Sequence, residues 1–411
     1  MCQSNMKTNY KKRNDRMNLN WKMNQETNCL TIELTGRIDS TNVAEAESAI
    51  FDLHNQHEGA QIIFDAQNLE YISSAGLRVL LKVRKMQEEL LIQNVSVEIN
   101  EIFEITGFSE IMKVEKAIRE LSLEGAEVIG QGGHGKVLRL NGDTIVKLFH
   151  PATPLEDVKR EQEYAKKAFV LGLPTAIPFD VVKCDDCYGL VFELINSTTL
   201  SDFLNKNPEK FEEYAVKYAN LLKQLHATKV TEDMLSGTKE LYRDRITSLG
   251  ELGYFTEKEI ENLHRINNAF ADDTCVIHGD FHAKNVMVMD GELILIDMAD
   301  ITYGNPLYDL GSMMLTHVTV SGERKEDISG MPSESVDKLW QIFISVYLGT
   351  TDANVIGLAM KKAGIFAVLK AGTALSFSPR ANTEFIINHL TKMVREKLLS
   401  NVDGCVQLLS M

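Results

Sequence analysis

Short apolar runs alternate with amphipathic segments between about residue 18 and residue 121. The runs at 30–35, 61–65 and 95–99 predict strands, because they are short and rich in apolar and β-branched residues. Between them, apolar side chains recur at helical spacing, namely Val43, Ala46, Ile50 and Leu53, and then Leu77, Leu80 and Leu81. We expect a last helix over residues 114–121. Alternating strands and helices predict an α/β layer.

The second of these helices follows the sequence Tyr-Ile-Ser-Ser-Ala-Gly-Leu at residues 71–77. A serine there can serve as the N-cap, because its side-chain oxygen accepts a backbone N–H of the first helical turn. Gly76 allows a tight turn from the strand into the helix. We therefore interpret this segment as a strand-to-helix junction.

A different architecture begins at Gly125. A glycine-rich turn lies between strand-like segments at 127–129 and 136–140, and another strand is predicted at 144–149. The chain then becomes helical, with an apolar stripe formed by Phe211, Ala215, Tyr218, Leu222 and Leu225. Asn207 and Pro208 are expected to cap that helix and open its first turn. No Pro- or Ser-rich linker separates the two halves.

Composition and charge limit the classes of function. A chain of 411 residues is long enough for two or three domains. Lys and Arg number 43 against 58 Asp and Glu, and a net charge of −15 argues against nucleic acid and anionic membrane surfaces as partners. Residues 1–17 are basic and predicted to be a disordered tail. The apolar stretch 356–377 contains three lysines, so no transmembrane helix is expected. Six scattered cysteines form no disulfide framework, and we expect a cytoplasmic protein.

Residues 64–80, together with 34–39, resemble the STAS domain of anti-sigma factor antagonists. The resemblance covers residues 18–121 and implies a mixed sheet with helices and an anti-sigma-factor-like protein partner. It also implies that Ser74 is a phosphorylation site, and phosphate at a helix N-terminus is favoured by free N–H groups and the helix dipole. The sequence departs from the family pattern at Ser73 and Ala75. The alternative is that Ser74 is only an N-cap.

The glycine-rich turn matches the pattern G-x-G-x-x-G-x-V with Gly130, Gly132, Gly135 and Val137. A dinucleotide-binding motif would continue as a helix, but a strand is predicted here, which favours a kinase-type loop over nucleotide phosphates. Lys147 then lies in an apolar strand, where an amine needs an anionic partner such as a phosphate; the alternative is an edge-strand lysine.

The next helical segment, 155–170, offers a carboxylate that can orient Lys147. Glu161 and Glu163 are both candidates, and we prefer Glu161. Further along, His278, Asp280 and Asn285 form the pattern H-x-D-x-x-x-x-N between apolar segments, as a kinase catalytic loop requires.

Roles follow from this order of motifs. Asp280 is predicted to accept or orient the proton of the substrate hydroxyl, and Asn285 to hold a metal ion. A hairpin turning at Asp290 and Gly291 is expected next. It ends at Asp297, whose carboxylate is a second predicted ligand for Mg²⁺.

Residues 122–411 resemble the aminoglycoside phosphotransferase and choline kinase-like family. The segments 278–282, 296–300 and 304–310 carry this resemblance. It implies a bilobal, protein kinase-like α+β fold, with an N-lobe and hinge at 122–195 and a largely helical C-lobe at 196–411. It also implies transfer of the γ-phosphoryl group of ATP, with Mg²⁺, to a hydroxyl of a small molecule.

The same resemblance assigns the hinge and a residue that braces the catalytic loop. Glu193 and Ile195 lie at the hinge, whose backbone is expected to pair with adenine, and Asp309 is expected to brace the catalytic loop. Gly279 stands where eukaryotic protein kinases usually have Arg.

Three further features are judged individually. We expect His282 to hold the loop rather than to contact phosphate, and Asp300 to be a solvated acid rather than a ligand. Cys184 and Cys187 could suggest a zinc site, but tetrahedral zinc needs four ligands and the sequence has no second such pair. We therefore predict that the two cysteines flank a hairpin turn.

Three functional hypotheses follow. The first is an active small-molecule kinase fused to a STAS regulatory module. The second is a STAS-based interaction protein whose kinase-like domain senses nucleotide. In the third, the kinase-like domain phosphorylates Ser74.

Overall fold

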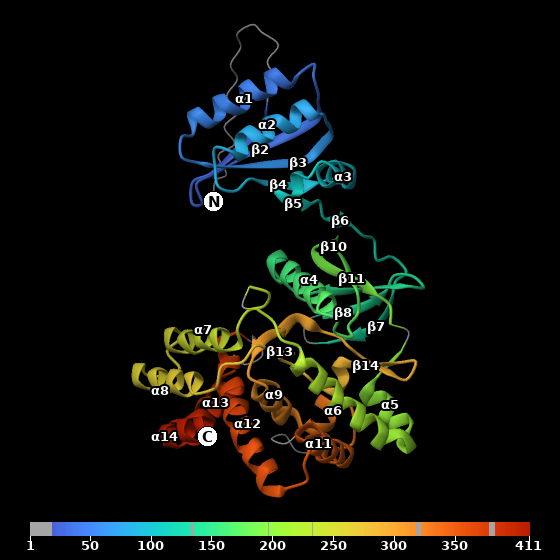
Figure 1. The fold of residues 1–411 in the computed structure, drawn as a ribbon, viewed down its shortest axis with the longest axis vertical. Coiled ribbons are helices and arrows are strands. Elements are labelled where there is room, and N and C mark those ends of the chain that lie inside the picture. Colours follow the sequence, from blue (N-terminus) through green and yellow to red (C-terminus); the bar gives the residue numbers. More distant parts are fainter. Residues whose placement is uncertain (1–18, 133–134, 196, 232, 318–321, 378–382) are drawn as a thin grey trace. The chain divides into compact units, whose positions relative to one another are not determined.

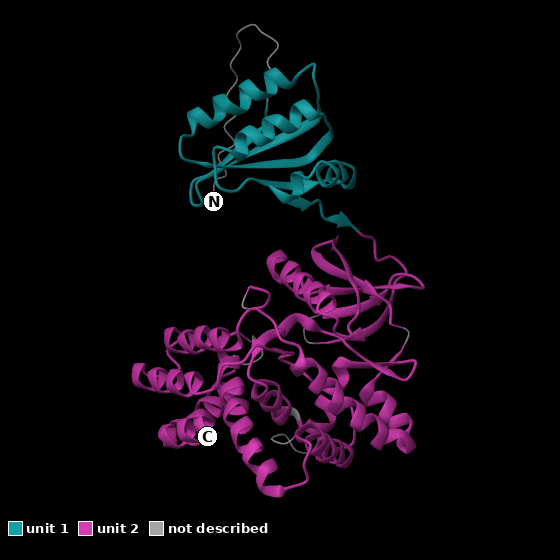
Figure 2. Ribbon diagram, viewed as in Figure 1, with its two compact units in different colours: residues 1–120 teal, residues 121–411 magenta. Residues whose placement is uncertain are grey.

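The computed structural model describes residues 19–132, 135–195, 197–231, 233–317, 322–377 and 383–411. Two compact units divide the chain between Glu120 and Leu121 (Figure 2). The predicted basic tail at 1–17, and Gly133 and His134 of the glycine-rich turn, lie outside the described residues.

Unit 1 is built on a five-stranded sheet in the order β1-β2-β3-β4-β5. The strands are β1 (Trp21–Asn24), β2 (Cys29–Ile38), β3 (Gln61–Ile72), β4 (Leu91–Val95) and β5 (Lys113–Lys116). Strand β1 runs antiparallel to β2, and the remaining neighbours are parallel, so the sheet is mixed. Leu30, Ile32 and Leu34 of β2 are buried because alternate side chains of a strand point to the same face.

Three α-helices accompany this sheet: α1 (Val43–Gln56), α2 (Ser74–Arg84) and α3 (Val97–Ile105). Helices α1 and α2 lie side by side (Figure 1), and Lys82 of α2 pairs with Glu47 of α1. Gly76 does not adopt a special backbone conformation. Its role is close packing, because a Cβ there would lie 2.7 Å from the Ile72 side chain.

Two of the predicted elements in unit 1 are wrong. Residues 95–99 contain only the end of β4 and then enter α3, whose N-cap Ser96 accepts the N–H of Ile99 at 3.3 Å. Residues 114–121 form no helix, because the chain runs through β5 and the short strand β6 (Arg119–Glu120). Val114 pairs with Ile92 of β4, so backbone hydrogen bonds from a neighbouring strand prevail over the apparent helical spacing.

Unit 2 begins with an antiparallel sheet that contains strands in the order β10-β11-β9-β8-β7. These are β7 (Glu127–Gln131), β8 (Gly135–Arg139), β9 (Thr144–Phe149), β10 (Pro178–Cys184) and β11 (Cys187–Glu193). Helix α4 (Leu155–Val170) lies between β9 and β10 in the chain, over the residues predicted from sequence. Cys184 pairs with Cys187 across a tight turn at Asp185, which has φ 51°. In the described part of the chain no group of three or more His, Cys, Asp or Glu could hold a metal ion.

The remainder of unit 2 is largely helical. Its α-helices are α5 (Leu200–Lys206), α6 (Phe211–Ala227), α7 (Thr238–Glu251), α8 (Glu257–Asn268), α9 (Leu307–His317), α10 (Glu323–Ser329), α11 (Ser333–Leu348), α12 (Ala353–Thr373), α13 (Glu384–Lys397) and α14 (Val402–Ser410). A 3₁₀ turn at Pro208–Lys210 precedes α6, so Asn207 and Pro208 open that turn and do not cap α6 as predicted. Helices α9 and α12 pack against each other, and Figure 1 shows α12 continuing from there to the lower edge of the picture.

Several short strands lie between α8 and α9 in the chain. They are β13 (Cys275–Ile277), β14 (Val286–Met289), β15 (Glu292–Leu295) and β16 (Thr302–Gly304). The hairpin between β14 and β15 turns at Asp290 and Gly291, both with positive φ, as predicted. The described helices include no single one long and apolar enough to cross a membrane, although Ser333–Leu348 with Ala353–Ser376 reaches that length and composition as a pair bent by 102°.

Candidate active site

The glycine-rich turn passes close to the strand that carries Lys147. Gly130 and Val137 pair across β7 and β8, and the N–H of Gly132 donates to the carbonyl of Gly135 at 2.9 Å. Gly135 has φ 150°, and a Cβ there would lie 1.9 Å from the carbonyl oxygen of Leu148. Only glycine fits this position, and Val137 pairs directly with Lys147 on β9.

Lys147 contacts carboxylates from two separate segments of the chain. Its Nζ lies 2.7 Å from Oε1 of Glu161 on α4 and 2.9 Å from Oδ1 of Asp297, which follows β15. The side chains of Lys147 and Glu161 are 14% and 7% exposed. Burial alone would lower the pKa of Lys147, but the two carboxylates outweigh it and raise that pKa above its ordinary value. The structure thus unites three residues predicted from separate motifs.

Glu163, the other candidate partner, takes no part in this cluster. Its Oε1 lies 2.7 Å from Nζ of Lys167, one helical turn further along α4. The geometry therefore favours Glu161 as the partner of Lys147.

Asp297 and Asn285 carry the oxygen atoms predicted to hold a metal ion. Asp297 has φ 61°, in the left-handed region, and its side chain is 31% exposed. Asn285 donates its Nδ2 to the carbonyl of Asp280 at 3.0 Å, so its amide oxygen is the atom left for a ligand. Carboxylate and amide oxygens are the donors that Mg²⁺ prefers, so this pair fits the predicted metal.

Asp280 lies on the loop between β13 and β14 with its side chain 44% exposed. Its Oδ2 is 3.4 Å from Nε2 of His282, and its Oδ1 is 3.7 Å from Nζ of Lys370. Burial opposes ionisation, but the hydrogen bond from His282 and the charge of Lys370 hold the pKa of Asp280 well below its usual range. The carboxylate is thus ionised and accessible.

Asp309 holds the start of this loop from α9. It is fully buried and accepts the backbone N–H groups of His278 and Gly279, both at 2.8 Å. Nε2 of His226 lies 3.0 Å from the same carboxylate. Burial would raise the pKa of Asp309, but its hydrogen bond with His226 is the main cause that lowers it. This is the bracing position predicted for Asp309.

The predicted hinge residues lie at the end of β11, for Glu193, and two residues beyond it, for Ile195. Glu193 pairs with Thr144, three residues before Lys147 on β9, and its N–H donates to the carbonyl of Ile177 at 3.0 Å. The carbonyl of Ile195 accepts a hydrogen bond from Oγ of Ser197 at 3.4 Å. The hinge is therefore held directly beside the lysine strand.

Comparison with known proteins assigns both units. Residues 20–121 match the STAS domain family, and residues 126–328 match the phosphotransferase enzyme family. The chain joins a STAS domain to a phosphotransferase-family domain. The mixed sheet with helices and the kinase-like fold with a helical C-terminal part are as predicted.

Individual relatives agree with this division. A putative anti-sigma factor antagonist of Bordetella bronchiseptica is 36% identical over 85 residues, which cover 20% of this chain and 72% of that protein. The anti-sigma-B factor antagonist of Listeria monocytogenes is 26% identical over 102 residues, covering 24% of this chain and 89% of that protein.

Solved structures also resemble the chain. An ADP-bound aminoglycoside phosphotransferase is 17% identical with a TM-score of 0.43, covering 75% of this chain and 97% of its own. A choline/ethanolamine kinase family protein from Mesorhizobium loti is 14% identical with a TM-score of 0.45, covering 70% and 92%.

In the STAS domain, the N-cap of α2 is Ser73, whose side chain accepts the N–H of Gly76 at 3.3 Å. Ser74 is the first residue of the helix and is exposed. The alternative that Ser74 serves only as the N-cap is therefore wrong. The first helical position leaves its hydroxyl accessible at the positive end of the helix dipole.

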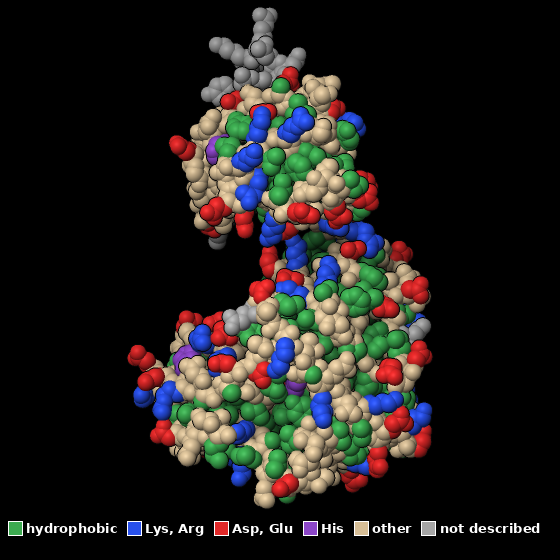
Figure 3. Space-filling view, viewed as in Figure 1, with side chains coloured by type: hydrophobic (Ala, Val, Ile, Leu, Met, Phe, Trp, Pro, Cys, Tyr) green, Lys and Arg blue, Asp and Glu red, His purple; other side chains and the backbone are tan. Residues whose placement is uncertain are grey.

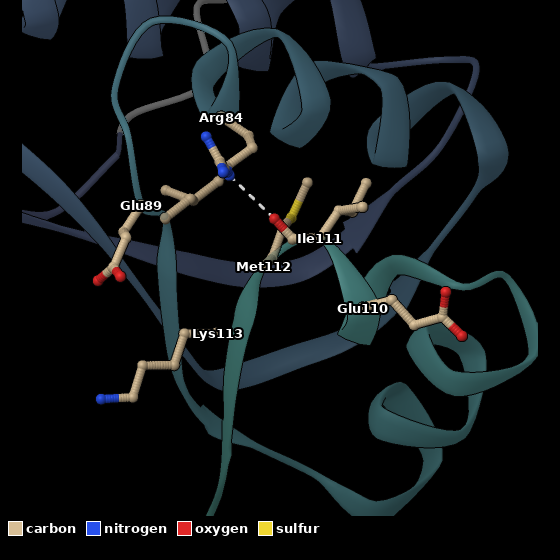
Figure 4. A pocket seen from close by; sticks show the side chains of 7 residues that line it. Arg84, Glu89, Glu110, Ile111, Met112 and Lys113 are labelled. Atoms are coloured by element: carbon tan, nitrogen blue, oxygen red, sulfur yellow. Dashed lines mark hydrogen bonds between the residues drawn. The ribbon is translucent and has the colours of Figure 1, made fainter. Parts of the chain in front are cut away.

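A pocket of about 290 Å³ lies at the other end of α2 (Figure 4). It is lined by Arg84, Glu89, Leu90, Glu110, Ile111, Met112 and Lys113. The guanidinium of Arg84 donates to the carbonyls of Ile111 at 2.9 Å and Gln87 at 2.8 Å. The hydrogen bonds of this arginine therefore stabilise the local backbone.

Sequence reasoning missed one residue of the phosphotransferase domain site. Lys370 of α12 contacts the predicted catalytic loop, although in the sequence it is only a charge that interrupts an apolar stretch. The available signal was that burying a lysine in an apolar helix requires a specific counter-ion.

Proposed function

We propose that the phosphotransferase domain transfers the γ-phosphoryl group of ATP, with Mg²⁺, to a hydroxyl group of a small molecule. The observation that carries this proposal is the bridge from Lys147 to Glu161 and Asp297, at 2.7 and 2.9 Å. A buried ammonium fixed between two carboxylates, beneath a glycine-rich turn, suits the binding of nucleotide phosphates. We also propose that the protein acts in the cytoplasm, because the reaction uses ATP.

The residues present fit the two cofactors. Lys147 and the backbone of Gly130, Gly132 and Gly135 would hold the phosphates, since glycine lets the backbone approach closely. Asn285 and Asp297 would hold Mg²⁺. Bound there, ATP would supply the phosphoryl group, and Mg²⁺ would neutralise negative charge on the phosphate oxygens.

Asp280 would act on the acceptor. Its ionised carboxylate orients the acceptor hydroxyl by accepting a hydrogen bond and takes the hydroxyl proton as transfer proceeds. Asp309 keeps the preceding peptide groups in place through two hydrogen bonds, so the position of Asp280 is set before the acceptor arrives.

The test is to incubate the full chain with Mg·ATP labelled at the γ-phosphate and a metabolite extract. Label in a small molecule that is lost in Asp280→Asn would support the proposal and identify the acceptor. Nucleotide binding without any transfer would contradict it and favour a nucleotide-sensing role.

For the STAS domain, a regulatory protein partner is the function best supported. Two relatives over this region are described as anti-sigma factor antagonists. Arg78 and Lys82 of α2 and Lys85 directly after it are exposed, as is Ser74, and basic side chains gather over this helix in Figure 3. This surface suits an acidic partner, and a phosphate on Ser74 would weaken that attraction.

A pull-down with the full chain and its Ser74→Asp variant tests this second proposal. Salt-sensitive capture of an acidic protein that Ser74→Asp loses would support it. The same labelling experiment shows whether the chain phosphorylates Ser74 itself, because label on the protein that disappears in Ser74→Ala would assign that reaction.

A further inference from the structure

Lys370 reaches the catalytic loop from a helix about 90 residues further along the chain. Its Nζ donates to the carbonyl of Gly279 at 2.6 Å and also to Oγ of Ser312 on α9. The same Nζ lies 3.7 Å from Oδ1 of Asp280. Ser312 in turn donates to the carbonyl of Gly279 at 2.9 Å. One ammonium group therefore holds the peptide that precedes Asp280 and faces the Asp280 carboxylate.

The fold brings this group into place through close helix packing. A Cβ on Gly311 of α9 would lie 2.6 Å from the carbonyl of Ala363 on α12, so glycine lets the two helices approach. Ser312, the next residue, thereby meets Lys370.

The position is costly for a lysine. Ile365, Phe366 and Leu369 on the same helix are buried, and the Lys370 side chain is only 20% exposed. Such a charge needs compensation. Burial would lower the pKa of Lys370, but Asp280 above all raises it, with Asp300, Asp309 and Tyr242 contributing. The acid that dominates the environment of Lys370 is thus the predicted catalytic one.

The loop itself cannot supply this cation from position 279. Gly279 has φ 82°, and a Cβ there would lie 2.5 Å from the carbonyl oxygen of Asp300. A longer side chain is excluded at the residue before Asp280. Lys370 of α12 instead supplies a positive charge that faces Asp280 from outside its own loop.

We propose that Lys370 is a positioning residue for phosphoryl transfer. It fixes the Gly279 peptide and the Asp280 carboxylate in the orientation that the acceptor hydroxyl requires. This role rests on the proposed function, and it acts on turnover rather than on nucleotide binding, because Lys147 and the glycine-rich turn lie on other elements. Misplacing a catalytic group by about 1 Å can cost about a hundredfold in rate.

The experiment compares Lys370→Met with Lys361→Met, which removes an exposed lysine from the same helix. One assay measures the rate at which the full chain transfers label from γ-labelled Mg·ATP to the small molecules of a metabolite extract. A separate calorimetric measurement gives the affinity for Mg·ATP. We expect Lys370→Met to transfer about a hundredfold more slowly, with the affinity for Mg·ATP changed less than about twofold. Lys370→Arg should recover most of the rate, and Lys361→Met should match the parent chain.

Other outcomes overturn the proposal. A rate in Lys370→Met within threefold of the parent removes any positioning role. A parallel loss of rate and nucleotide affinity that Lys370→Arg does not recover would make Lys370 a general structural residue. If Lys370→Met does not fold, Lys370→Gln replaces it in the same assays, because glutamine keeps a hydrogen-bond donor without the charge. The same outcomes then support or overturn the proposal.

A second measurement separates this inference from the proposed function. If the parent chain transfers no label, hydrogen exchange over residues 278–285 decides the role of Lys370. Exchange at least tenfold faster in Lys370→Met than in Lys361→Met shows that Lys370 orders the loop, while equal exchange refutes it.

Discussion

A Cβ atom on Gly279 would lie 2.5 Å from the carbonyl oxygen of Asp300 and 2.8 Å from its Cβ. Gly279 also has φ 82°, a conformation that residues with side chains rarely adopt. The predicted catalytic loop therefore passes Asp300 at a distance that only glycine permits. This contact explains in physical terms why the residue before Asp280 is not the arginine common in protein kinases.

The first prediction follows directly. Gly279→Ala should destabilise the phosphotransferase domain by about 1–3 kcal/mol, because the added methyl group must strain the backbone or displace Asp300. Transfer activity should fall as well. Thermal unfolding of the full chain measures the first effect and label transfer the second.

The matched control is Gly357→Ala, since a Cβ at this helical position of α12 would meet nothing within 4 Å. That change should be neutral or slightly stabilising. Equal losses in the two variants would contradict the argument from crowding at Gly279.

Local motifs identified most of the candidate site in advance, since the glycine-rich turn, Lys147, Asp280 and Asn285 each follow a short pattern. The choice of Glu161 over Glu163 needed the direction of a helix face, which spacing alone does not give. Lys370 could not be assigned, because its contact with Asp280 depends on how α12 packs against α9.

The errors in the fold have the same origin. Residues 114–121 can satisfy a helical spacing, but β4 offers a strand partner that only the tertiary structure reveals. At residues 95–99 the strand ends early because Ser96 caps a helix. At the start of α2 the sequence offered two adjacent serines, and backbone geometry decided between them.

The second prediction concerns the partner of Lys147. Glu161→Gln should raise KM for Mg·ATP by about tenfold to a hundredfold, the range for losing a hydrogen bond to a charged group. The amide oxygen of glutamine still accepts a hydrogen bond from Lys147 but carries no charge, so the ammonium would draw the Asp297 carboxylate more strongly and away from the predicted metal. Steady-state kinetics at varied Mg·ATP measures this change.

Glu163→Gln is the control, because Glu163 is an exposed residue of the same helix and pairs with Lys167. Its KM should equal that of the parent chain. A similar rise in both variants would show that the effect comes from α4 as a whole.

The third prediction separates the two serines at α2. Ser73→Ala should destabilise the start of this helix by about 1 kcal/mol, because its side chain accepts the N–H of Gly76. Ser74→Ala should leave stability unchanged. Hydrogen exchange of the first turn of α2 in the full chain is the measurement, and faster exchange in Ser74→Ala than in Ser73→Ala would reverse the assignment.

The fourth prediction is a pH dependence that arises from His317 of α9. This imidazole is 3% exposed, and burial, the largest cause, lowers its pKa to about 4 despite its hydrogen bond with the carbonyl of Met313. Between pH 6.5 and 4 the unfolded chain binds a proton at this histidine that the folded chain does not. Stability must therefore fall as the pH falls through this window, by up to about 3 kcal/mol.

Other groups also respond in the acid range, so the contribution of His317 is a difference between two chains. His282, Lys325 and Asp337 face this imidazole and remain in both. Denaturant unfolding of the parent and of His317→Gln at intervals from pH 7 to pH 4 should show a steeper loss of stability in the parent. Parallel curves would mean that His317 is protonated in the folded state and is not buried as a neutral group.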